Sequence, residues 1–166
     1  LLVGNALTKL KHLEDGSIDL IITSPPYWNA VVYDKDVNTD YESYLNLLTD
    51  IFSECSRILR PNGKMAIILP NGNLENPSLK YLRHFISYTC DILSVIKLPQ
   101  DTFVHSGTGV KTSILFLKKK DFTNQSLENS IDIFFSEIKK IGFTANKSGK
   151  KIYKKDKLGN TLKDEN

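Results

Sequence analysis

Four consecutive residues near the start of the chain, Ser24, Pro25, Pro26 and Tyr27, combine groups that could hold one kind of ligand. Each proline fixes its own φ and has no N–H to donate, and Pro26 also restricts Pro25 to an extended backbone. The carbonyl of Pro25 is therefore held rigidly, with the hydroxyl of Ser24 beside it as a second acceptor. Tyr27 offers a flat face on which a ring can stack. The pattern predicts binding of an NH2 group attached to a planar ring.

A nucleobase with an exocyclic amine is such a ligand, and it is accessible only when it is unpaired or flipped out of a duplex. The structural alternative is a proline turn that ends a strand and packs its aromatic residues in the core. The surrounding sequence favours the binding interpretation, because a buried strand is expected directly before the motif and a polar loop, 29–40, after it.

The elements that must position this motif alternate along the chain. Short apolar runs predict strands, and apolar residues at helical spacing predict helices. Strands are expected at 1–3, 17–23, 64–69, 92–98 and 111–117, and helices at 6–13, 41–59, 77–89 and 131–141. The strand 17–23 is apolar almost throughout, which is typical of a central parallel strand buried on both faces. In the helix 77–89, the apolar side is assigned to Leu79, Leu82, Phe85 and Ile86.

This alternation predicts an α/β domain with a mostly parallel sheet and helices on both faces. The connection 99–110 lacks helical periodicity, so the last two strands are expected to form an antiparallel hairpin that closes one edge of the sheet. In such sheets ligands bind beyond the carboxyl ends of the parallel strands, which is where the motif follows the strand 17–23.

The composition is that of an ordinary globular domain, with 166 residues, 40% of them hydrophobic and 25% charged. The formal net charge of +3 permits a polyanionic partner without requiring one. No segment is long and apolar enough to span a membrane, and the first residues lack the features of a signal peptide. A cytoplasmic protein is therefore expected.

The cysteines and histidines do not form a recognisable ligand set. Cys55 and Cys90 lie in apolar segments without metal-ligand or redox spacing, so they are expected to be core residues. His12, His84 and His105 are scattered along the chain, and no metal site is predicted.

The stretch GNALTKLKHLEDGSIDLIITSPPYWN, residues 4–29, closely resembles the catalytic region of the S-adenosylmethionine-dependent DNA amino-methyltransferases. These enzymes methylate adenine N6 or cytosine N4, and their signature is [D/N/S]-P-P-[Y/F/W] after a strand. The resemblance implies a Rossmann-like sheet, with Ser24 to Tyr27 as the catalytic motif and Trp28 as a substrate contact. It also implies that Asn5 contacts the cofactor, at a position where the family usually has aspartate.

The second half is similar to the modification subunits of type I restriction systems, in "KMAIILPNGNLENPSLKYLRHFI", "ILSVIKLPQDTFVHSGTGVKTSILFLKKK" and "FFSEIKKIGFTANKSGKKIYKKDKLGN". In that family the segment L-P-x-x-x-F supplies an aromatic residue near the target base, which here is Phe103. Packing of Phe103 in the core remains the alternative. The resemblance implies DNA as a partner, with a specificity subunit or domain and possibly a restriction subunit.

The segment DTFVHSGTGVKT superficially resembles the glycine loop that binds the cofactor in permuted methyltransferases. A cofactor loop follows a buried strand and opens a helix. Here the glycines precede a strand-like segment, so Gly107 and Gly109 are expected to be turn residues of a hairpin. With no other cofactor loop present, 1–143 is expected to be the C-terminal part of a methyltransferase catalytic domain, and 144–166 a basic polar tail.

The implied reaction is direct transfer of a methyl group from S-adenosylmethionine to the amine of a flipped base, with adenine N6 favoured over cytosine N4. One alternative is an inactive piece that only binds a partner subunit or DNA. Another is methylation of RNA or of a protein amide, for which similar motifs also serve. The lysines near the end of the chain could contact phosphates or form a solvated tail.

Overall fold

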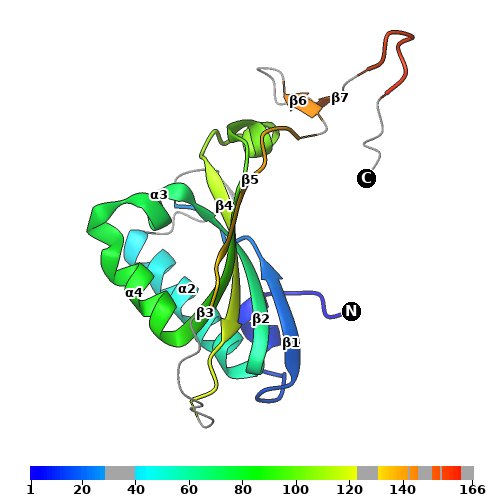
Figure 1. Cartoon of the computed structure of the whole chain (residues 1–166). Helices are drawn as coiled ribbons and strands as arrows, with labels where there is room; N and C mark the ends of the chain where they lie inside the picture. The colour runs from blue at the N-terminus through cyan, green and yellow to red at the C-terminus, as the bar shows by residue number, and fades with distance from the viewer. Residues whose placement is uncertain (29–39, 123–130, 142, 146–150, 154, 162–166) are drawn as a thin grey trace.

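A five-stranded sheet, in the strand order β1-β2-β4-β3-β5, forms the centre of the computed structural model, which describes residues 1–28, 40–122, 131–141, 143–145, 151–153 and 155–161 (Figure 1). The strands are β1 (Ile18–Thr23), β2 (Leu59–Pro70), β3 (Cys90–Lys97), β4 (Thr112–Lys119) and β5 (Phe134–Glu137). β1 is parallel to β2 and β5 is parallel to β3, whereas β4 runs antiparallel to both of its neighbours. The sheet is thus mostly parallel in strand direction, and the predicted α/β class is confirmed.

Helices connect these strands. They are α1 (Ala6–Leu10), α2 (Tyr41–Ile58), α3 (Asn71–Glu75) and α4 (Lys80–Thr89), with the 3₁₀ helices η1 (Pro77–Leu79) and η2 (Gln100–Ser106). A separate two-stranded sheet pairs β6 (Phe143–Ala145) with β7 (Lys151–Tyr153), so β6 crosses the predicted domain boundary and β7 lies in the predicted tail. None of the described helices is long and apolar enough to cross a membrane.

The core lies between one face of the sheet and the helices α2, α3 and α4. Ile67 of β2 and Leu115 and Leu117 of β4 are buried there, at 7%, 1% and 7% exposure. Residues from all three helices pack against them, namely Phe52, Leu74 and Ile86. α1 packs against α2.

β1 was expected in the middle of the sheet, but it is an edge strand. Leu20 is 52% exposed and Ile22 is 75% exposed. An apolar run indicates that a strand is built for burial, but it does not reveal which strands flank it. The apolar character of β1 therefore exceeds what its neighbours in this chain bury.

The antiparallel pair of β3 and β4 is confirmed, although it does not close an edge. β4 pairs along its length with β2 as well as with β3, from Lys64↔Lys118 to Pro70↔Thr112, so it lies inside the sheet. The edge is formed by β5, in a segment expected to be helical. The apolar spacing of 131–141 fits a helix, but its isoleucine and phenylalanine residues favour a strand, and pairing with β3 decides the outcome.

Smaller differences concern the ends of the elements. Residues 1–3 form no strand, and α3 occupies a segment expected to be a loop. In α4, Ile86 packs on the core, whereas Phe85 is 63% exposed, as are its neighbours on the same helix face, Tyr81 and Tyr88, at 70% and 71%. A helix with apolar residues on both faces leaves its orientation undetermined by sequence alone.

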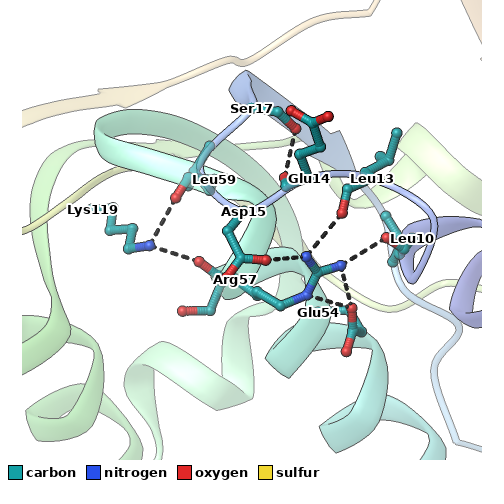
Figure 2. Close-up of polar contacts among 10 residues, drawn as sticks. Leu10, Leu13, Glu14, Asp15, Ser17, Glu54, Arg57, Leu59 and Lys119 are labelled. Carbon is teal, nitrogen blue, oxygen red and sulfur yellow. Dashed lines mark hydrogen bonds and ion pairs between the residues drawn. The ribbon is translucent and has the colours of Figure 1, made fainter.

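Polar contacts join α1 and α2 at the end of the sheet opposite the carboxyl end of β1 (Figure 2). Arg57, in the last turn of α2, donates to the carbonyls of Leu10 and Leu13 at 3.0 and 2.9 Å, and it forms ion pairs with Asp15 and Glu54. The pKa of Arg57 is raised, first by its hydrogen bond to Asp15 and then by that to Glu54. These bonds tie the end of α1 and the segment after it to the last turn of α2.

Candidate functional site

The motif predicted to bind an amine lies at the carboxyl end of β1, beside the carboxyl end of β2. The hydroxyl of Tyr27 donates a hydrogen bond to the carbonyl of Ile68 at 3.1 Å. This bond crosses from the motif to the neighbouring strand and fixes one end of the tyrosine side chain. Ser24 is exposed, while Pro25, Pro26 and Tyr27 are half-buried. The residues therefore lie where a ligand could reach the predicted acceptors.

The acceptors of the motif differ in their hydrogen bonding. The carbonyl of Pro26 accepts a hydrogen bond from the hydroxyl of Tyr44 at 2.8 Å. The hydroxyl of Ser24 and the carbonyl of Pro25 take part in no hydrogen bond within the described part of the chain. Rigid acceptors that the described residues leave without a donor are suited to hold the two hydrogens of an exocyclic amine. The predicted role of Ser24 and Pro25 therefore remains a prediction that the geometry supports.

Trp28 packs against the first turn of α2. Its ring centroid lies 5.3 Å from those of Tyr41 and Tyr44, with interplanar angles of 64° and 45°. Tyr41 and Tyr44 are themselves stacked, with centroids 6.2 Å apart. Trp28 remains 37% exposed, so its predicted contact with a substrate would use the part of the ring outside this cluster.

Phe103 lies in η2, which follows the carboxyl end of β3. Because β1, β2 and β3 run in the same direction, Phe103 and the motif both lie at the end of the sheet where the carboxyl ends of these strands are found. Between β1 and β3 lie β2 and β4. Phe103 is half-buried, and its contact with the base remains a prediction.

The glycine-rich segment after η2 is a turn, as expected. Gly107 has a φ of 88°, in the left-handed region, and its N–H donates to the carbonyl of Val104 at 3.0 Å. The chain then enters β4 at Thr112 and does not open a helix. This segment consequently lacks the geometry of a cofactor loop.

Asn5 caps the N-terminus of α1. Its Oδ1 accepts a hydrogen bond from the N–H of Thr8 at 3.2 Å. The cap therefore uses Oδ1 of Asn5, which is the atom that corresponds to a carboxylate oxygen of the aspartate usual at this position. Its amide nitrogen donates no hydrogen bond within the described residues, so Asn5 fits a cofactor only as a donor.

Two features at the carboxyl ends of the strands, near the motif, were not predicted from the sequence. The first is Tyr44, which the sequence placed in a helix without a role. The second is a buried polar group where β2 ends and β4 begins, in which Ser113 donates to Asn71 at 2.9 Å. The hydroxyl of Thr112, opposite Pro70, is fully buried and has no hydrogen-bond partner among the described residues. Polar residues directly after a strand, as in Pro70-Asn71-Gly72, could have indicated this group.

Three titratable groups of the described residues have shifted pKa values in or beside the elements that carry the site. The pKa of Asp40, which caps α2 before Tyr41, is lowered chiefly by the hydrogen bond it accepts from the backbone N–H of Ser43. Burial raises the pKa of the Cys55 and Cys90 thiols, and both cysteines are free, which agrees with their expected place in or beside the core. Within the described residues, no group of three histidine, cysteine or acidic side chains could hold a metal ion.

Comparison with known proteins adds the family. The chain matches the family model of the N-6 DNA methylases over residues 1–163. It is 28% identical over 123 residues to the type I restriction enzyme EcoEI methylase subunit of Escherichia coli, which covers 73% of this chain and 25% of that protein. It is 41% identical over 70 residues to the type II methyltransferase M.HpaI of Haemophilus parainfluenzae, over 42% of this chain and 22% of that protein. The chain thus spans about a quarter of the length of these relatives.

A solved structure shares the fold. A Listeria monocytogenes protein assigned to the class I S-adenosylmethionine-dependent methyltransferases superposes with a TM-score of 0.51 at 17% identity. The match covers 79% of this chain and 40% of that one. The partial Rossmann-like α/β fold expected from the sequence is thereby confirmed.

Proposed function

Since the chain belongs to the N-6 DNA methylase family, we propose that it carries the amine-binding part of the active site of a DNA methyltransferase. The observation that carries the proposal is the pair of unsatisfied acceptors, Ser24 Oγ and the Pro25 carbonyl, next to the anchored ring of Tyr27. A base flipped out of the duplex would stack on Tyr27 and donate its two amine hydrogens to these acceptors. Acceptors held in place orient the nitrogen and stabilise the positive charge that develops on it.

We propose adenine N6 as the target, in agreement with the family description, and cytosine N4 as the alternative outcome of the test below. Trp28 and Phe103 are proposed as further contacts to the nucleotide. They follow the carboxyl ends of β1 and β3, which β2 and β4 separate in the sheet. The substrate is DNA, and a specificity subunit or domain and a restriction subunit are proposed partners, because the EcoEI relative is a methylase subunit of a type I restriction enzyme. A cytoplasmic location is proposed on the same basis.

The proposed methyl donor is S-adenosylmethionine, which supplies an electrophilic methyl group when bound. Within the described residues only Asn5 was assigned to it, and the oxygen of Asn5 is used in the helix cap. The residues of this chain therefore fit the cofactor only in part. We propose that the other cofactor contacts come from residues outside this chain.

The exposed side chains of the edge strand β1 support the proposal that residues outside this chain complete the site. β1 presents Leu20 and Ile22 at 52% and 75% exposure, and burying such side chains stabilises a protein by about 1.5–3 kcal/mol each. We propose that the rest of a longer catalytic domain packs against β1. In this proposal 1–143 is the C-terminal part of that domain, and 144–166 is a basic extension.

The test compares this chain with a longer protein that also contains the residues expected before it. Calorimetry should show S-adenosylmethionine binding by the longer protein and little or none by this chain. Binding by neither would refute the enzyme proposal and favour an inactive interaction piece.

The target base is identified in DNA that the longer protein has methylated. Mass spectrometry of nucleosides from treated DNA should show N6-methyladenine, whereas N4-methylcytosine would refute the choice of base. Ser24→Ala removes one acceptor and should lower the rate of methylation by about tenfold or more.

A further inference from the structure

We propose that Tyr44 is a positioning residue for the amine-binding motif, an inference that rests on the proposed function. Tyr44 belongs to the first turns of α2, 18 residues after Pro26, and its hydroxyl donates to the Pro26 carbonyl at 2.8 Å. It touches neither of the acceptors assigned to the base. Its effect on the reaction would therefore pass through the backbone of the motif.

Tyr44 bonds to the carbonyl that directly follows the acceptors assigned to the base. An exocyclic amine has two hydrogens to donate, and Ser24 Oγ and the Pro25 carbonyl are the two acceptors assigned to them. The Pro26 carbonyl, one residue further on, accepts its hydrogen bond from Tyr44. The protein thus uses the Pro26 carbonyl to hold the backbone next to the Pro25 acceptor.

Two hydrogen bonds hold the motif rigidly in place. The hydroxyl of Tyr27 is anchored to Ile68 of β2, and the carbonyl of Pro26 is anchored to Tyr44 of α2. The φ of Pro26 is fixed by its ring, so the two anchors hold the peptide that carries the Pro25 carbonyl as well as the plane of Tyr27. The motif is thus attached to two different elements, one on each side. A catalytic geometry that is preorganised in this way is sensitive to small displacements.

The ring of Tyr44 has a separate contact with Trp28, at a centroid distance of 5.3 Å. Tyr44→Phe keeps this ring contact and removes the hydroxyl. Tyr41→Phe is the matched control, because Tyr41 also contacts Trp28 but its hydroxyl makes no hydrogen bond within the described residues. Equal effects of the two variants would indicate a role in packing alone.

The first experiment uses this chain by itself. Trp28 is the single tryptophan, so its fluorescence reports on the segment that directly follows the motif. Tyr44→Phe should make Trp28 more accessible to quenching by acrylamide and lower its fluorescence anisotropy, whereas Tyr41→Phe should leave both unchanged. Unchanged quenching and anisotropy in Tyr44→Phe would overturn the inference, whether or not the chain is part of a methyltransferase.

The second experiment measures methyl transfer by the longer protein. Tyr44→Phe should lower kcat about tenfold with little change in the KM for DNA, because the hydrogen bond orients the acceptors and does not bind the duplex. A rise in KM at constant kcat would overturn the positioning role. If the unsubstituted longer protein transfers no methyl group, the proposed function fails, and the fluorescence result still decides whether Tyr44 anchors the motif.

Discussion

Gly63 and Gly72 provide a pair of identical substitutions with opposite expected effects on stability. Gly63 is buried where β2 enters its regular pairing with β1. A Cβ at this position would lie 2.8 Å from the carbonyl oxygen of Arg60 and 2.8 Å from Cδ1 of Leu59. Leu59 is itself 5% exposed, and Arg60 is followed by Pro61, so neither neighbour can move without disturbing the start of β2.

The magnitude follows from these distances. Forcing a methyl group into a packed site costs about 1–3 kcal/mol. Replacing glycine by alanine also reduces the entropy of the unfolded chain, which stabilises either variant by about 0.4–1 kcal/mol. At Gly72, in α3, no described residue beyond its chain neighbours and helix backbone comes within 4 Å of the added Cβ, so only the stabilising effect remains. Gly72→Ala should therefore exceed Gly63→Ala in the free energy of unfolding by about 1–3 kcal/mol.

The assay is equilibrium unfolding in urea, followed by circular dichroism and by the fluorescence of Trp28. Gly63→Ala should lower the midpoint and Gly72→Ala should raise it slightly, with unchanged slopes. In thermal unfolding, each kcal/mol corresponds to about 2–4 °C in Tm for a chain of this size. Equal midpoints for the two variants would refute the close approach at Gly63, because their effects on the unfolded chain are the same.

Two further predictions concern titratable groups. The pKa of Asp40 is lowered in the folded chain by Ser43, so its stabilisation is complete above the unfolded pKa, near 3.8, and is lost as the pH falls through the lower folded value. Melting curves should show Asp40→Asn to be less stable than the unsubstituted chain at pH 6, with a difference that vanishes at strongly acidic pH; a difference independent of pH would contradict the assignment. Burial raises the pKa of the Cys55 thiol, so alkylation followed by mass spectrometry should find Cys55 protected at pH 8 in the native chain and reactive in urea. Alkylation of Cys55 at the same rate in both conditions would show that the thiol is not buried.

Much of the local structure could be predicted from the sequence, because it depends on local signals. Asp40 before an amphipathic run marks the start of α2. The end of this helix was less well predicted: the next strand was expected at 64, whereas β2 begins at Leu59 and includes Pro61 and Gly63. The place of the motif after β1 also followed from the sequence, because Pro25 and Pro26 have no N–H to donate to a neighbouring strand.

The arrangement of the strands could not be predicted in the same way. The edge position of β1 and the central position of β4 depend on pairing between residues far apart in the chain, such as Pro70 and Thr112. Strand formation at Phe134–Glu137 depends on pairing with β3, and the local sequence does not reveal that this partner is present. Tyr44 was overlooked for a related reason, since its hydrogen bond to Pro26 joins residues 18 positions apart and leaves no periodic signal.

The central position of β4 has a consequence for the order in which the protein can form during synthesis. β2 and β3 leave the ribosome before β4, yet they become neighbours only through it, because β4 pairs with both. Until residue 119 has emerged, the β1–β2 pair and β3 cannot join into one sheet. The strands that β4 will flank therefore have unpaired edges. The β3–β4 hairpin is the most local of these pairings, so we expect it to form first and then to capture β2. A nascent chain halted before β4 would consequently expose the strand edges that a chaperone must cover.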